Sequence, residues 1–240
     1  MQLIIIGGQA GVGKTTLAHL IAKQAFELGF IPVVSSFAAS LKKAAEERGC
    51  SKKDNPVGYR KFCQELGASE RAKDPDHWVK LFDASVVEIE AEEKQDLEKN
   101  EQYWERCVIV DDCRYANEVK YGMEKGAASL FLMYGERENP NKTKRWLAHE
   151  SEELGNTVSG NPKLFGDAFQ YFIYNDGTLK DLEEKVEVSS PFWCNVQADP
   201  ESSIKMKEIS RCLSELIDLL LLNAVEEEKD EDPPYCEGAD

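Results

Sequence analysis

Apolar and polar positions along residues 1–187 switch repeatedly between strand-like and helix-like spacing. Compact apolar runs, rich in β-branched or aromatic residues, predict five buried strands at 2–6, 31–36, 107–111, 129–134 and 170–174. Between them, apolar spacing predicts helices at 14–28, 37–49, 58–66, 115–125 and 178–186, and a long helix that begins near Pro75. Strands that alternate with helices are typical of an α/β fold whose parallel sheet is covered on both faces, with ligands at the carboxyl ends of the strands.

The remaining segments are polar or irregular. The polar stretch 88–105 predicts a solvated helix end. A charged, irregular stretch covers 135–167, and a connecting loop is expected after residue 187. Residues 203–224 have the spacing of an amphipathic helix, which is expected to pack on the domain or against a second copy in a homodimer. The tail 225–240 has eight acidic residues and one lysine, which predicts disorder.

Composition narrows the classes of function. The 240 residues are 42% hydrophobic, enough for a core, and the formal net charge of −16 argues against docking on nucleic acid. Small anionic ligands remain compatible with a few local cations. The seven cysteines form no CxxC pair, which favours free thiols in a reducing cytoplasm. No signal peptide or membrane span is expected, because the apolar runs near both ends are too short.

Residues 8–15, GQAGVGKT, fit the pattern G-x-x-x-x-G-K-[ST] between a predicted strand and a predicted helix. In this context the pattern predicts the P-loop fold and a site for a nucleoside triphosphate, ATP, with Mg²⁺. The glycines let backbone N–H groups turn toward phosphate oxygens, Lys14 reaches the β- and γ-phosphates, and Thr15 ligates Mg²⁺. The residues expected around the triphosphate are Gly8, Gly11, Val12, Gly13, Lys14, Thr15 and Thr16.

A second group of polar residues follows the strand at 107–111. Asp111 and Asp112 are expected at its carboxyl end beside the P-loop, and Asp112 is taken as the acid that assists Mg²⁺. Arg114 is expected to bind an anion, and Glu118 to orient Arg114 or to accept hydrogen bonds from a substrate. The alternative is a surface Arg–Glu pair at i,i+4 spacing, worth a few tenths of a kcal/mol.

A third group lies within the stretch 60–78. Two cations suit a monophosphate, a glutamine amide can contact a base edge, and a tryptophan face can stack on a base. An ordinary basic helix face with a core tryptophan is the alternative. The residues concerned are Arg60, Lys61, Gln64, Arg71 and Trp78.

Six motifs in this order resemble the bacteriophage deoxynucleoside monophosphate kinase family across roughly residues 1–187. They are GQAGVGKTT, SFAASLKKA, RKFCQELG with DPDHWV, VIVDDCRYANEV, HESE and YNDGTLKDLEEKV. The resemblance implies transfer of the γ-phosphoryl group of ATP to a deoxynucleoside monophosphate, in the host cytoplasm. It also implies that Arg60, Lys61, Gln64 and Trp78 bind this acceptor, together with the element Asp112, Arg114 and Glu118.

Two departures from the family pattern bear on specificity. Thr15 stands where the family often has aspartate, which leaves ATP binding intact, and GAS at 67–69 stands where it often has G-T-E. The resemblance places the acceptor-binding part at about 37–105 and a lid at about 135–153. It leaves residues 188–240, the extension 188–224 and the acidic tail, without a counterpart.

The expected lid is cationic, and a lid cation stabilises charge on a transferring phosphoryl group. Arg137 and then Arg145 are the candidates, although a solvated loop with scattered ion pairs is an equal alternative. His149 is expected to cap a helix or to pack, with contact to a phosphate as the alternative. Asn175 lies in a turn that either borders the adenine or is purely structural. Two other functions stay open: a kinase for another small metabolite, and a non-catalytic regulator that binds ATP.

Overall fold

The computed structural model describes residues 1–99, 104–135 and 149–193. Within them, five parallel strands form one sheet in the order β2-β3-β1-β4-β5. The expected lid arginines Arg137 and Arg145, the helix at 203–224 and the acidic tail lie outside the described residues. The central strand β1 leads through the P-loop sequence into the first helix, so the predicted α/β P-loop fold is confirmed.

The ends of the strands match their predicted positions within two residues. Because parallel strands at the centre of a sheet are buried on both faces, their sequences are continuously apolar, as in LIII of β1 and CVIV of β3. The strands are β1 (Gln2–Gly8), β2 (Ile31–Ser35), β3 (Arg106–Cys113), β4 (Ala128–Met133) and β5 (Tyr171–Tyr174).

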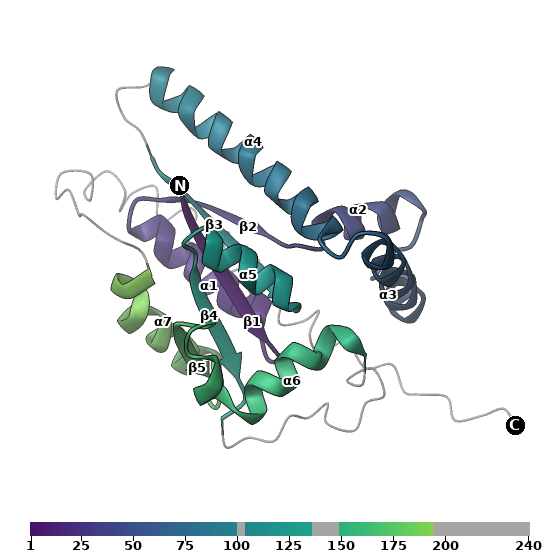
Figure 1. Ribbon diagram of the computed structural model, residues 1–240. Helices are drawn as coiled ribbons and strands as arrows, with labels where there is room; N and C mark the ends of the chain where they lie inside the picture. Colours follow the sequence, from purple (N-terminus) through teal and green to yellow (C-terminus); the bar gives the residue numbers. More distant parts are fainter. Residues whose placement is uncertain (100–103, 136–148, 194–240) are drawn as a thin grey trace, which may run out of the picture.

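Two hydrophobic cores lie on opposite faces of the sheet. One core is built by α1 (Lys14–Glu27) and α7 (Leu179–Trp193), and the other by α4 (His77–Lys99), α5 (Ala116–Glu124) and α6 (Glu153–Gly160). In Figure 1, α5 lies in front of the sheet, and α2 (Ala39–Glu47) and α3 (Pro56–Lys73) lie together beyond the end of β2. The sheet is therefore covered on both faces and leaves its carboxyl edge for the polar groups.

The helices depart from the sequence predictions in three places. Helix α3 continues to Lys73, so Arg71, expected on a loop, lies on a helix. The stretch expected to be irregular contains α6 between two short 3₁₀ turns, Glu150–Glu152 and Pro162–Phe165. Helix α7 continues through Trp193, so the residues expected to begin a connecting loop are helical.

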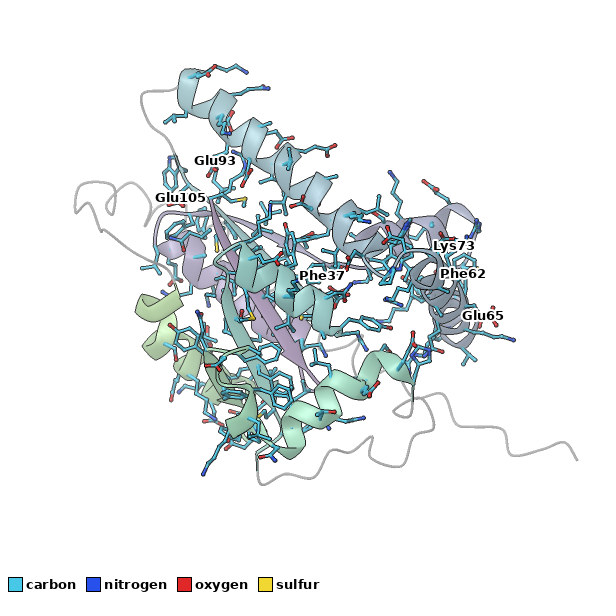
Figure 2. The ribbon with its side chains drawn as sticks, in the orientation of Figure 1. Phe37, Phe62, Glu65, Lys73, Glu93 and Glu105 are labelled. Carbon is cyan, nitrogen blue, oxygen red and sulfur yellow. The ribbon has the colours of Figure 1, made fainter. Side chains whose placement is uncertain are left out.

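The polar second half of α4 is mostly solvated, as predicted, with one buried exception. Glu93 accepts a hydrogen bond from the backbone N–H of Arg106 at 2.7 Å. Figure 2 shows Glu93 beside Glu105, at the end of the sheet where β3 begins. This bond ties the far end of α4 to the amino edge of the sheet, opposite the candidate site.

Two of the predictions from composition can be compared with the described residues. All four cysteines among them are free thiols, as expected. No helix in the described part of the chain is both long and apolar enough to cross a membrane.

Substitution of Phe131 tests the core between the sheet and the helices on the α5 face. Phe131 is fully buried, and its ring centroid lies 4.9 Å from that of Phe169 and 6.1 Å from that of Phe172. Phe131→Ala should lower the free energy of unfolding by about 3–5 kcal/mol, measured by urea denaturation. The control Leu164→Ala, at a residue 74% exposed, should change it by less than about 0.5 kcal/mol. Equal effects would contradict this description of the core.

Candidate functional site

The P-loop forms a phosphate cradle between β1 and α1. Gly13 has φ of 95°, in the left-handed region that favours glycine, and it directly precedes the first residue of α1. Val12 is buried in the core beneath the loop, so its side chain anchors the cradle while its backbone remains part of the turn. Thr16 is buried in the first turn of the helix. The expected triphosphate residues are therefore contiguous at the amino end of α1, which favours anions.

Lys14 folds back over the cradle. Its ammonium donates to the carbonyl oxygens of Gly8 at 3.0 Å and Gln9 at 2.8 Å. Burial, followed by the positive charge of Arg114, lowers the pKa of Lys14 to about 8. The charges of Glu152, Asp111 and Asp112 oppose this shift, and a triphosphate in the cradle would oppose it further, so the cradle suits an anion.

The acid beside Thr15 is Asp111 and not Asp112. The hydroxyl of Thr15 donates to Asp111 Oδ2 at 2.7 Å, which brings two hard oxygen ligands together at the end of β3. Mg²⁺ binds through one or two carboxylates, waters and substrate phosphates, so this pair fits that ion. No group of three or more metal-binding side chains occurs in the described ranges.

Asp112 has a different partner, which corrects its expected place beside the metal. Its carboxylate accepts the backbone N–H of Phe37 at 2.7 Å and that of Ala38 at 3.2 Å, and Lys42 lies 3.6 Å from it. The acid thus holds the turn that begins α2. Successive side chains of a strand point to opposite faces, so only one of two adjacent acids can face the cradle.

Arg114 pairs with a residue that the sequence interpretation did not include in the site. Its guanidinium donates to Oε1 of Glu152, a side chain only 3% exposed, whereas the expected partner Glu118 accepts the backbone N–H groups of Arg114 and Tyr115. Burial opposes the charge of Arg114, but Glu152, Asp112 and Glu118 together raise its pKa. Arg114 is thus held as a permanent cation at the end of β3. Its side chain keeps 34% exposure.

One face of α3 supplies further polar groups. Arg60, Gln64 and Arg71 are spaced at i, i+4 and i+11, so they share a stripe with the buried Gly67. The guanidinium carbon of Arg71 lies 3.8 Å from the ring centroid of Tyr115. Tyr115 directly follows Arg114 in the sequence, so Arg71 reaches the segment between β3 and α5 that carries Arg114. The stripe therefore reaches the carboxyl edge of the sheet at its Arg71 end.

Two expected acceptor residues lie elsewhere. Lys61 is 74% exposed and has Glu65 at 3.9 Å, an i,i+4 pair on the solvent face. Trp78 is 5% exposed, and its Nε1 donates to the carbonyl of Gly67 at 3.3 Å. The buried ring braces α3 against α4, so the alternative of a core tryptophan describes this structure, and the stacking face is covered by protein.

The segment 149–156 docks on the outer side of the cradle. Glu152 Oε2 accepts the N–H of Ala10 at 3.0 Å, and Asn156 accepts from the side chain of Gln9 at 3.0 Å. A Cβ on Gly155 would lie 3.2 Å from Cα of Gln9, so glycine permits this close approach. His149 caps the 3₁₀ turn through the N–H of Ser151, as predicted.

Asn175, which follows the edge strand β5, contacts the cradle and holds it in place. Its amide donates to the carbonyl of Val12 at 2.9 Å, directly after β5 ends. The turn at Asn175 therefore has the structural role that was one of its two expected roles. The signals available in the sequence were the motif HESE, which contains Glu152, and the turn NDGT, which begins with Asn175.

An open groove of about 600 Å³ adjoins Asp111, the acid that accepts a hydrogen bond from Thr15. Its lining comes from the end of β2, the first two turns of α2 and the end of β3. Ser35, Ser36, Lys42, Glu46 and Asp111 give it a polar wall of mixed charge. A ligand in this groove would reach Asp111 from the β2 edge of the sheet, the edge farthest from β5.

Comparison with known proteins adds little to this geometry. No protein-family model matches the chain, and no curated protein matches its sequence. Among solved structures, shikimate kinase from Acinetobacter baumannii in complex with shikimate is similar over 82% of this chain and 96% of its own. The identity is 13% and the TM-score 0.36, and a likeness this distant carries no argument about function.

The buried carboxyl group of Glu118 makes stability depend on pH. Burial, followed by the charge of Asp112, raises its pKa from 4.5 to about 8, while the two N–H bonds oppose the shift. The folded state therefore favours the protonated acid. Its contribution to stability is fully present below pH 4.5 and is lost as pH rises toward 8.

Glu118→Gln keeps an oxygen for the two N–H groups and removes the titration. Relative to the variant, the wild type should lose about 3.5 kcal/mol of unfolding free energy between pH 5 and pH 8, since each pH unit between the two pKa values is worth about 1.4 kcal/mol. Urea denaturation at three pH values measures the difference. Glu124→Gln, an exposed acid of the same helix, is the matched control. A constant difference between wild type and Glu118→Gln across this range would contradict the assignment.

Proposed function

We propose that this protein is a P-loop kinase that transfers the γ-phosphoryl group of ATP to a deoxynucleoside monophosphate. The proposal is carried by the approach of two anion-binding cations from different elements. Lys14 lies in the cradle and Arg114 at the end of β3, close enough that the charge of Arg114 helps to lower the pKa of Lys14. Two cations held against their mutual repulsion favour a site that receives phosphates from both sides.

The residues divide between a donor side and an acceptor side. Lys14 and the backbone of the cradle would hold the β- and γ-phosphates of the donor. Arg114 and Arg71 would hold the acceptor phosphate, because guanidinium groups suit phosphate oxygens. Transfer then needs alignment and charge stabilisation, with no covalent intermediate on the protein.

Thr15 and Asp111 would hold Mg²⁺ between the two sides. When bound, the metal would neutralise negative charge on the phosphate oxygens. The contribution of the chain is to fix two oxygen ligands 2.7 Å apart at the carboxyl end of the central strands.

A nucleotide acceptor is supported by the residues beside the cations. Arg60 and Gln64 continue the stripe of Arg71 along α3, and these two residues lie in RKFCQELG, one of the six motifs that resemble the phage kinases. If the acceptor were another small metabolite, the alignment of Arg60, Gln64 and Arg71 along α3 would have no explanation. Lys61 and Trp78 add no support, because one is solvated and the other is buried beneath α3.

The acceptor is tested by ADP release from Mg·ATP with dGMP, dTMP, dCMP, dAMP and their ribose counterparts offered singly. We expect turnover with one or more deoxynucleotides and a loss of about 100-fold or more in kcat for Lys14→Ala, with the fold intact by circular dichroism. ATP binding without turnover on the whole panel would overturn the proposal in favour of another acceptor or a nucleotide-gated regulator.

The two adjacent acids give a paired test of the metal site. Asp111→Asn should lower kcat by about 100-fold and raise the Mg²⁺ concentration at half-maximal rate, because the substitution weakens a direct ligand. Asp112→Asn should leave that concentration within twofold of wild type and lower thermal stability, because its carboxylate holds two backbone N–H groups. The reverse pattern would return the metal role to Asp112.

A further inference from the structure

Glu152 joins the two sides of the candidate site through one carboxylate. Oε2 accepts the N–H of Ala10 in the cradle at 3.0 Å, and Oε1 accepts from the guanidinium of Arg114. The side chain is 3% exposed, so water cannot easily replace either partner. A single rigid group thus touches the loop that would hold the donor and the cation that would hold the acceptor.

The neighbours of Glu152 hold it in this position. It ends the 3₁₀ turn Glu150–Glu152 and directly precedes α6, and Gly155 one turn later packs against the backbone of Gln9. The side chain of Asn156 accepts a bond from that of Gln9. The carboxylate therefore cannot follow Arg114 away from the cradle without moving α6 as well.

We infer that Glu152 is a positioning residue that couples the acceptor site to the cradle. Phosphates that order the cradle at Ala10 fix the carboxylate, and the carboxylate fixes the guanidinium of Arg114 for the acceptor. By linkage the effect is reciprocal: an acceptor held by Arg114 also steadies the cradle for ATP. This inference rests on the proposed function for its acceptor, but the contact between Ala10, Glu152 and Arg114 can be tested without one.

The first arm of the experiment needs no acceptor. Hydrogen–deuterium exchange of the cradle peptide, residues 8–14, is followed in the intact protein without nucleotide. Glu152→Gln and Arg114→Ala should both speed exchange at Ala10 by about tenfold, the first because it weakens the acceptor of that N–H, the second because it releases the carboxylate. Glu153→Gln, an exposed acid next in sequence, should leave exchange within twofold of wild type.

The second arm measures coupling with the deoxynucleotide that supports turnover. A non-hydrolysable ATP analogue should tighten acceptor binding in the wild type and in Glu153→Gln, and this effect should fall to about onefold in Glu152→Gln. The acceptor KM of Glu152→Gln should rise about tenfold with a smaller change in kcat. A merely structural role would lower thermal stability but leave the ratio of acceptor affinities unchanged.

Each outcome bears on one claim. Unchanged exchange in Arg114→Ala would overturn the coupling, whatever the activity. Wild-type coupling in Glu152→Gln would do the same. If no acceptor is turned over but both variants speed exchange, the proposed acceptor fails while the link between Arg114 and the cradle stands. Should Glu152→Gln unfold, Arg114→Ala at its partly exposed position carries the first arm alone.

Discussion

The pairing of β1 with β3 on one side and β4 on the other determines where the cradle and the acids at the end of β3 can lie. Parallel strands in register end at one edge, so the cradle after β1 and the acids at the end of β3 meet without long loops. The register of β1 shifts relative to β3 between Ile5 and Gly7, where the two strands approach the site. Flanking pairs with β2 and β5 bring the start of α2 and Asn175 to the same edge.

The site gathers several acids and cations in a small, largely buried region of an acidic protein. Buried polar and charged groups are tolerated only when their hydrogen-bonding capacity is used, and here each acid has defined donors. Asp112 and Glu118 take backbone N–H groups, Asp111 takes a hydroxyl, and Glu152 takes one backbone and one guanidinium group. The cationic side chains facing the cradle are thereby left with defined orientations.

Much of this arrangement was predictable from local patterns, and the remainder depends on tertiary contacts. The strands and the cradle follow from apolar runs and from GQAGVGKT, because both signals lie within a few consecutive residues. The choice between Asp111 and Asp112 depends on which face of β3 meets α1, and the sequence of β3 alone does not contain that information. The partner of Arg114 lies 38 residues away in a turn too short for a periodic signal. Whether Trp78 stacks on a base or lies in the core stayed open, because propensity says nothing about whether α3 covers it.

Helix α2 begins without a capping side chain of its own, since Ala38 offers none, and the carboxylate of Asp112 on β3 instead holds the N–H groups of Phe37 and Ala38 just before the helix. Side chains that cap the first turn are strongly preferred at the N-cap position of helices. Here the chain at the start of the helix is held from another element, and the groove-lining side chains of Ala39, Lys43 and Glu46 take no part in capping it. This wall of the groove can therefore change in size and charge during evolution with little loss of foldability, which makes it a natural place for ligand preference to diverge among related chains.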